Sequence, residues 1–535
     1  MGITTVRRED SLKSTAEMLF LLGAVLLVLV PASPFFQHLT SGDSGIFLYV
    51  GWLVTDGAIP YRDAWDSKPP LIFAIDALGL FLGNGSRWGV WAIEVVSLFS
   101  AAVIAFALVK RAFGKWPAIY ATFAWLLNAF LAMDGGNYTT EYALPLQFAC
   151  LWLIGTAPKD SLSTRRAFVI GLLGSLLFWL KPNLIGIPTA IGLYLVMGLI
   201  ASSKKSTQVQ ALIAIVAGGV LISLLVLAPF AAFGALGQLW DGAFRYNFDY
   251  IQTTWMKRLL VLRDIPLLIP TASLALFGII GWLLTGVTAL ERACKSKEMD
   301  APRRQLLIAL PTDPAQTDQA HLSQHQLTVL LLVSLIALPL ELLLVSLSGY
   351  PFDHYFLALL PVSTIFAALT FRTILWALAY LKISRPVTAL LLLSFLVVTG
   401  ALATENVRRI LGRVTGRDKP AVIDYIVENT RPTDRVLIWG GEARVLFAAR
   451  RASPSRFFTF LPLQRASADP KRVQEFLDEA LQHPPRLILD PHDGTPFLQF
   501  PSTSPAIEEL ESRLRATYRW RTEVNGWTVY ERLDE

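Results

Sequence analysis

The chain has 535 residues, of which 53% are hydrophobic and only 16% charged, with a formal net charge of +6 and a mean hydropathy of +0.49. Soluble globular proteins carry about 25% charged residues, so this composition excludes an ordinary soluble protein. From Glu405 onward the chain has 20 Lys and Arg against 19 Asp and Glu. The excess base therefore lies in the loops of the apolar part, which argues against a nucleic-acid partner.

The apolar part predicts a polytopic α-helical membrane protein, because each bilayer-crossing helix needs about 20 mostly apolar residues. The first run, 17–36, lacks a small-residue cleavage site, so we expect a retained helix and no signal peptide. About eleven transmembrane helices are predicted, at 17–36, 88–109, 116–133, 141–157, 167–180, 183–200, 209–232, 266–289, 326–348, 355–381 and 387–404.

Basic residues mark every second loop between these spans, and such loops are cytoplasmic by the positive-inside rule. The rule puts the N-terminus in the cytoplasm and the tail after Thr404 outside, in a multi-pass protein of the plasma (inner) membrane. The marking residues are Arg7, Arg8, Lys13, Lys110, Arg111, Lys115, Lys159, Arg165, Arg166, Lys204, Lys205, Arg292, Lys295, Lys297, Arg303, Arg304, Lys382 and Arg385.

The first external loop, 37–87, concentrates charge beside the membrane, which is costly unless the charges work in a wet cavity or at the interface. Its carboxylates could take a proton from a hydroxyl, and its cations could hold an anionic leaving group. The segments 44–56 and 71–82 are too short to span and predict interfacial helices, although they could instead seal the rim of the bundle. The charged residues are Asp43, Asp56, Arg62, Asp63, Asp66 and Lys68.

Asp43 and Lys68 are the strongest candidates in this loop. Asp43 is a candidate base, with a helix N-cap as the equally weighted alternative. Lys68 precedes Pro69-Pro70, so its backbone is held extended. A lysine fixed near the membrane surface could bind a phosphate, or its side chain could instead only reach the membrane surface as an anchor.

The other external loops hold further candidates, each with a structural alternative. Asp134 and Glu141 flank Gly-Gly-Asn-Tyr-Thr-Thr and could bind a sugar or acceptor hydroxyl, or Glu141 could simply favour a helix start. Lys181-Pro182-Asn183 adds a cation, and the favoured alternative is that these residues only separate two helices. His354 could bond a phosphate or could belong to a capped helix start.

Positive charge in the long external loop 233–265 opposes the orientation rule, which suggests an anion to hold or contacts to lipid headgroups. The residues are Arg245, Tyr246, Lys257, Arg258 and Arg263. The two cysteines and the six histidines form no ligand set, so no metal cage is predicted, and whether a divalent cation takes part is left open.

Residues 405–535 change in character and predict a small extracytoplasmic α/β domain, set against a transmembrane domain of 1–404. Helices are expected at 420–429, 470–482 and 505–516, and a turn at Gly440-Gly441. Strands are expected at 435–439, 456–460, 486–489 and 527–530.

These features together resemble the GT-C membrane glycosyltransferases, the superfamily of the protein O-mannosyltransferases and the aminoarabinose transferase. The resemblance is strongest to the bacterial branch of dolichyl-phosphate-mannose–protein mannosyltransferases. The matching residues are Asp43, Trp65 with Lys68-Pro69-Pro70, Glu141, Lys181-Pro182 and Pro-Phe-Asp-His-Tyr at 351–355.

The resemblance implies transfer of a sugar, with inversion, from a polyprenyl-phosphate donor to a hydroxyl of a lipid, glycan or protein acceptor outside the membrane. Asp43 would deprotonate the acceptor. The departing lipid phosphate would be met by Lys68, Arg245, Arg258 and His354, and substrate contacts would come from Trp65, Asp66, Asp134, Glu141, Lys181 and Tyr355. Asp43-Ser44 replaces the Asp-Glu of many members, and Ile46 and Phe47 replace the arginine and tyrosine of aminoarabinose transferases, which disfavours that sugar.

Two alternatives stay open. A sugar-polymer ligase with a lipid-diphosphate donor would share the topology. A transporter or flippase should carry ionisable residues in mid-span and two related halves, whereas Glu94 and Glu341 are scattered cases and no halves are evident.

Overall fold

The structure is a computed structural model that describes residues 2–533, except 134, 159–161, 202–204, 251–253, 264–273, 296–321, 416–419, 465–468 and 493–504. Its contacts divide the chain into two compact units. Unit 1 comprises Met1–Pro31, Glu94–Leu225 and Ile251–Arg413, and unit 2 comprises Ala32–Ile93, Val226–Tyr250 and Val414–Glu535. The predicted division at residue 404 stays a prediction about sequence domains.

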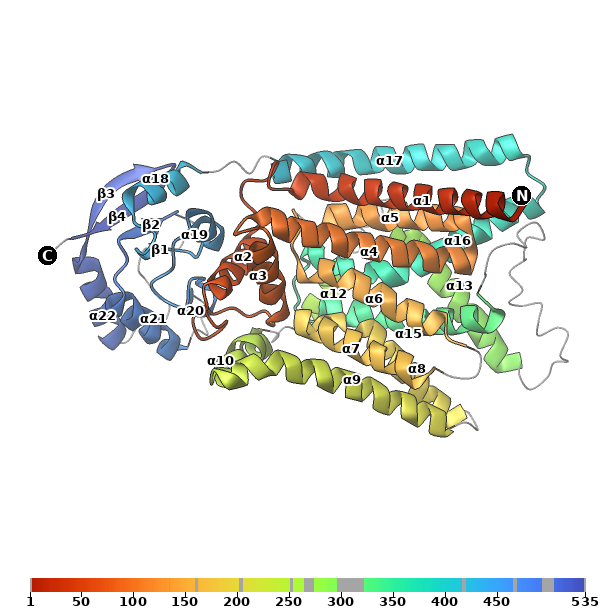
Figure 1. The fold of residues 1–535 in the computed structure, drawn as a ribbon, viewed down its shortest axis with the longest axis horizontal. Helices are drawn as coiled ribbons and strands as arrows, with labels where there is room; N and C mark the ends of the chain where they lie inside the picture. The colour runs from red at the N-terminus through yellow and green to blue at the C-terminus, as the bar shows by residue number, and fades with distance from the viewer. Residues whose placement is uncertain are drawn as a thin grey trace. The chain divides into compact units, whose positions relative to one another are not determined.

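Unit 1 is built from helices, and Figure 1 shows the long ones running side by side. Each of the eleven predicted spans overlaps a helix, although α1 begins well before residue 17 and α17 continues well beyond residue 404, and residues 266–273 lie outside the described part of the chain. The helices are α1 (Gly2–Leu29), α4 (Arg87–Phe113, from Glu94 onward), α5 (Lys115–Ala132), α6 (Thr139–Gly155), α7 (Thr164–Leu180), η2 (Pro182–Leu184), α8 (Gly186–Ala201), α9 (Lys205–Ala232), α12 (Trp255–Arg263), α13 (Leu274–Lys295), α15 (Gln324–Ser346), η5 (Asp353–Leu359), α16 (Leu360–Tyr380) and α17 (Arg385–Thr415).

Six of the helices in the described part of the chain are long and apolar enough to cross a membrane. They contain residues Ser14–Ala32, Arg87–Phe113, Lys205–Ala232, Leu274–Glu291, Gln324–Ser346 and Asp353–Tyr380. The span of η5 and α16 is 72% buried inside the protein, whereas that of α9 is 17% buried. The chain is therefore a multi-pass integral membrane protein in which α16 is central to unit 1 and α9 is peripheral, with a surface left for lipid.

Unit 2 begins with two short apolar helices, α2 (Gly42–Thr55) and α3 (Leu71–Leu82), which pack against each other. They confirm the helices expected at 44–56 and 71–82. Helix α2 begins at Gly42 with Ser41 as its N-cap, so Asp43 lies inside the first turn, and the N-cap reading of Asp43 is wrong. Unit 2 also contains Ala32 at the end of η1 (Val30–Ala32), the end of α9 from Val226 onward, α10 (Leu236–Trp240), the π-helical turn η3 (Asp241–Arg245) and α11 (Tyr246–Tyr250).

The C-terminal part of unit 2 is a four-stranded mixed sheet with helices. The sheet order is β1-β2-β4-β3, with β1 parallel to β2 and the other pairs antiparallel. The elements are α18 (Ala421–Asn429), β1 (Val436–Ile438), α19 (Ala443–Ala449), α20 (Leu461–Gln464), α21 (Pro470–Gln482), β2 (Leu487–Asp490), α22 (Pro505–Ala516), β3 (Tyr518–Val524) and β4 (Trp527–Arg532).

One predicted strand of this domain is wrong. Residues 456–460 form an irregular segment, because the Arg456 N–H and the Ser455 hydroxyl bond the Glu479 carboxylate instead of a strand neighbour. Phe457, Phe458 and Phe460 are all buried, so they do not alternate between a core face and a solvent face as strand residues would. Helix α19 and strand β3 were not predicted.

Candidate functional site

Asp43, Asp66 and Lys68 come together in unit 2. Lys68 Nζ lies 3.5 Å from Asp43 Oδ2, and the two side chains are 20% and 36% exposed. The same ammonium lies 5.7 Å from the centroid of the Phe47 ring. A carboxylate and an ammonium from two segments of the first external loop thus meet at a partly exposed place.

Asp66 is the buried member of this cluster. Its Oδ1 accepts the Ser67 N–H at 2.6 Å, and within the described residues its Oδ2 has no hydrogen-bond partner. Burial raises the pKa of the Asp66 carboxyl to about 6, opposed by the nearby Lys68 charge and assisted by Asp43. Such a displaced pKa beside an acid–base pair is typical of functional sites.

Trp65 is a core residue. It is 1% exposed, its ring packs edge-on against Tyr246 at 4.9 Å, and its backbone N–H donates to the Arg456 backbone carbonyl at 2.8 Å. Trp65 is therefore buried in this structure and does not offer its side chain to a substrate at the surface. Its contacts instead fix the backbone that leads to Lys68. Arg245, also in unit 2, is exposed at the end of η3.

A second cluster of predicted residues lies in unit 1, around the loop before α6. The Asn137 N–H, at a φ of +62°, donates to Glu94 Oε1 at 2.5 Å and to Glu141 Oε2 at 3.0 Å. Glu141 is fully buried in the first turn of α6. Its carboxylate therefore holds the backbone of this loop from a buried position, and a role of Glu141 in substrate binding stays a prediction. Asp134 lies outside the described residues.

His354, Tyr355 and Lys181 adjoin this loop. The His354 ring stacks on Tyr138 at 4.3 Å and contacts Tyr355 at 4.7 Å. Lys181 is extended at the end of α7, and its Nζ lies 3.3 Å from the centroid of the Tyr355 ring, a cation–π contact. Three residues predicted separately from the sequence therefore form one aromatic and cationic cluster in unit 1, in which Tyr355 and the Lys181 Nζ are buried.

Glu341 of α15 positions the segment that follows Lys181. It is fully buried, and its Oε1 accepts the Ile187 N–H at 3.0 Å and the Gln147 amide at 3.2 Å. The carboxylate thus satisfies a free donor in the first turn of α8. Glu341 thus has a structural role, so its presence in mid-span does not favour the transporter alternative.

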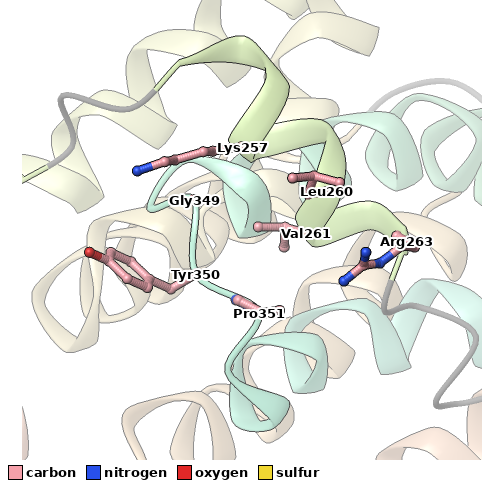
Figure 2. A pocket seen from close by; sticks show the side chains of 7 residues that line it. All are labelled: Lys257, Leu260, Val261, Arg263, Gly349, Tyr350 and Pro351. Carbon is pink, nitrogen blue, oxygen red and sulfur yellow. The ribbon is translucent and has the colours of Figure 1, made fainter.

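The cations of the long external loop follow two patterns. The Arg258 guanidinium lies 4.8 Å from the Trp255 ring centroid. Lys257 and Arg263 instead flank a cavity of about 280 Å³. Figure 2 shows them on α12, with Tyr350 on the facing loop. Apolar side chains and the two cations together suit an amphipathic anion. The lining residues are Lys257, Leu260, Val261, Arg263, Gly349, Tyr350 and Pro351.

Residues 5–302, more than half of the chain, match the profile of the competence-induced protein Ccs4 N-terminal domain. The chain belongs to this family. A 72-residue stretch of this Ccs4-type chain is 33% identical to the dolichol phosphate-mannose mannosyltransferase of Haloferax volcanii. That alignment covers 14% of the chain and 16% of the archaeal protein, so the chain matches about a sixth of the length of this relative.

Two solved structures resemble the Ccs4-type chain over most of its length. ArnT from Cupriavidus metallidurans, crystallised with undecaprenyl phosphate, aligns with a TM-score of 0.57 and 13% identity over 96% of this chain and 98% of ArnT. The oligosaccharyltransferase AglB from Archaeoglobus fulgidus, in complex with an inhibitory peptide and a dolichol-phosphate, aligns with a TM-score of 0.52 and 11% identity over 89% of this chain and 69% of AglB. These alignments show that the chain has an ArnT-like fold.

Sequence reasoning missed the residues of this Ccs4 family member that hold the predicted ones in place. Tyr61, Asp241, Asn247, Arg456 and Arg472 contact the Trp65–Lys68 segment or its neighbours. Their partners lie up to 395 residues away in the sequence, so no local pattern could reveal them. Among the described residues, no group of three or more His, Cys, Asp and Glu side chains is placed to hold a metal ion.

Proposed function

We propose that the chain is a membrane glycosyltransferase that moves a sugar from a polyprenyl-phosphate donor to an acceptor hydroxyl at the external face. The single observation that carries this proposal is the accessible pair of Asp43 and Lys68, 3.5 Å apart, in a chain with an ArnT-like fold. The undecaprenyl phosphate in ArnT and the dolichol-phosphate in AglB support a lipid phosphate as the donor's carrier.

The reaction assigns one role to each charge. Asp43 takes the proton of the acceptor hydroxyl as its oxygen attacks the anomeric carbon. The bond from that carbon to the phosphate oxygen breaks, and the electron pair leaves with the lipid phosphate. Lys68 meets the negative charge that develops on that phosphate. Attack opposite the leaving group inverts the anomeric configuration.

The direct contact between Asp43 and Lys68 is compatible with these roles. A partly exposed ion pair contributes only about 0–1 kcal/mol, so a bound sugar phosphate can separate the two charges at little cost. The donor phosphate then replaces Asp43 as the partner of Lys68. Asp43 is released to accept the acceptor's proton.

The remaining candidates take supporting roles in the proposal. Arg245 lies in the same unit as Asp43 and Lys68 and would add positive charge near the lipid phosphate. Arg258, His354, Lys181 and Tyr355 belong to unit 1 and stay candidates from the resemblance alone. Asp66, Trp65 and Glu141 are buried, and we assign them to positioning. The acceptor is a lipid, glycan or protein hydroxyl.

The test measures sugar transfer by membranes that contain the wild type or Asp43→Asn, with a panel of polyprenyl-monophosphate and polyprenyl-diphosphate sugars. We expect the variant to insert normally and to lose transfer by on the order of 10²- to 10⁴-fold, as for loss of a general base. Glu428→Gln, which removes an exposed carboxylate of α18, should retain wild-type activity.

Each other outcome counts against a defined part of the proposal. Wild-type transfer by Asp43→Asn would remove Asp43 as the base. Transfer from diphosphate donors alone would replace the proposal with the ligase alternative. Passage of labelled lipid-linked sugar across the membrane, without transfer to any acceptor, would favour the transporter alternative.

A further inference from the structure

The segment from Tyr61 to Lys68, here called the lysine loop, lies in the same compact unit as residues 414–535. The two are separated by most of the chain, yet they share a hydrophobic core. Trp65 packs there with Tyr246 of α11 and with residues of the C-terminal domain. These are Leu437, Trp439, Phe457, Phe460, Leu463, Val473, Phe476, Leu477, Ala480, Ile488, Ile507 and Leu514.

Arg456 holds the lysine loop at two points. Its carbonyl accepts the Trp65 N–H at 2.8 Å, and its guanidinium donates to the Tyr61 carbonyl at 2.9 Å. The rest of the guanidinium forms a fork on the Glu475 carboxylate at 2.7 and 2.9 Å. The Arg456 side chain is 14% exposed and that of Glu475 42%, so this geometry is held by partly buried, charge-assisted bonds.

Arg472 holds the segment that covers the other side of the loop. Its guanidinium bonds both oxygens of Asp241 at 3.0 Å, and it lies 5.9 Å from the Trp65 ring and 5.7 Å from the Tyr246 ring. It is also only 14% exposed. One C-terminal arginine therefore orders the 241–246 segment and the tryptophan of the lysine loop together.

The contacts continue from these arginines to Lys68 itself. The Asn247 amide donates to the Ser67 carbonyl at 2.6 Å, and the Tyr61 hydroxyl donates to the Lys68 carbonyl at 2.6 Å. A Cβ at Gly242 would lie 2.8 Å from the Asp66 carbonyl, so the 241–247 segment is packed directly on the loop. The backbone on both sides of the Lys68 side chain is thereby fixed.

We propose that the C-terminal domain acts as a positioning device for Lys68, with Arg456 and Arg472 as its positioning residues. The inference rests on the proposed role of Lys68 at the departing phosphate. A cation that stabilises a transition state must sit at a defined place, and a displacement of about 1 Å can cost 10²-fold in rate. The two arginines supply that placement from outside the membrane-spanning part of the sequence.

The first experiment measures loop mobility and does not depend on activity. Ser67→Cys is introduced into a chain carrying Cys150→Ser and Cys294→Ser, and its labelling rate by a membrane-impermeant maleimide is followed. We expect Arg456→Ala or Arg472→Ala to raise the rate about tenfold or more, because each removes charge-assisted bonds that restrain the loop. Arg486→Ala is the matched control, because it breaks an ion pair with Glu531 inside the same domain.

The second experiment measures transfer kinetics per folded protein in the same arginine variants without the cysteine. We expect kcat to fall by on the order of 10- to 100-fold while the KM for the lipid-phosphate sugar changes less, since Lys68 acts on charge that develops in the transition state. Arg472→Lys should recover part of the loss, because it restores a cation between Asp241 and the two rings. Arg486→Ala should reduce only the yield or stability.

The two readouts separate the possible failures. Unchanged labelling and unchanged kcat in both arginine variants would overturn the positioning role. Faster labelling, with no transferase activity detectable in the wild type, would keep the restraint on the loop and overturn the proposed function. Equal losses in Arg486→Ala and the two test variants would mean a general folding role and would also overturn the inference.

Discussion

At the scale of the residue, the pKa of Asp66 makes the folding stability of the protein depend on pH. Its carboxyl is buried beside Lys68 and Asp43, and burial raises its pKa from 3.8 to about 6. A raised pKa means that the folded protein binds more protons than the unfolded chain between these two values. Folding stability therefore falls as the pH rises from about 4 to about 6, and it is level above that range.

The test compares the stability of Asp66→Asn with that of the wild type from pH 4 to pH 7. Asn keeps a neutral side chain at all of these values, so the variant should lack the loss that the wild type shows. The shift of about two pKa units corresponds to a difference on the order of 3 kcal/mol. Thermal unfolding in detergent is the measurement.

Asp63, in the same loop, is a control because its pKa is shifted in the opposite direction to that of Asp66. Partial burial acts to raise the pKa of its carboxyl, but bonds from Arg62 and the Ile59 N–H outweigh burial and lower it. Asp63→Asn should therefore cost stability above pH 4. A curve for Asp66→Asn that runs parallel to the wild type would show that Asp66 does not titrate in this range.

At the scale of the element, the close packing of α2 on α3 fixes the helix that carries Asp43. Gly51 of α2 meets α3 so closely that a Cβ would lie 2.7 Å from the Asp76 Cβ and 3.0 Å from the Ala77 nitrogen. Both of these atoms belong to a helix that cannot move without disturbing its neighbours. Glycine is therefore required at this contact for steric reasons.

Gly51→Ala should destabilise the protein by about 1–3 kcal/mol, the usual cost of overpacking. Gly42→Ala, in the same helix, is the matched control, because no atom lies within 4 Å of its added Cβ. It should be neutral or slightly stabilising, since alanine favours a helix over glycine. Thermal unfolding of both variants decides the point, and equal melting temperatures would contradict the steric argument.

The elements that sequence analysis predicted are those with a local signal. Long apolar runs predicted the helices of unit 1, six of which, in the part of the chain that the structure describes, are long and apolar enough to span a membrane, and the short runs after Ser41 and Pro70 predicted α2 and α3. Strand β3 had a signal that was overlooked: Asn525 and Gly526 both have positive φ and form the two-residue turn to β4, the pairing typical of tight hairpins. No local pattern could show that residues 456–460 are not a strand, because their backbone conformation depends on Glu479 and on core residues that are distant in the sequence.

The candidate site shows the same limit. Asp43 and Lys68 could be predicted as neighbours because both stand in one charged loop. The burial of Trp65 and Glu141 could not, because the atoms that cover them come from distant segments. Tyr49, for example, accepts the N–H of Ser453, which lies 404 positions away.

At the scale of the whole molecule, the composition of unit 2 bears on the predicted orientation. Its three segments, Ala32–Ile93, Val226–Tyr250 and Val414–Glu535, come mainly from the loops 37–87 and 233–265 and the tail after Thr404. The positive-inside rule independently predicts all three to be external. Trp65, Tyr246 and the C-terminal domain share one hydrophobic core, so these three segments must lie on the same side of the membrane, as the charge pattern also requires.

This agreement predicts the outcome of cysteine labelling in intact cells. In a chain carrying Cys150→Ser and Cys294→Ser, Glu428→Cys on exposed α18 should react with an impermeant maleimide, and Ser384→Cys between α16 and α17 should react only after permeabilisation. Lys382 and Arg385 flank Ser384, and by the positive-inside rule we expect them to keep that turn in the cytoplasm. Reaction of both cysteines in intact cells, or of Ser384→Cys alone, would contradict the orientation. An external α18 is also required by the proposed reaction, because the C-terminal domain shares unit 2 with Asp43 and Lys68.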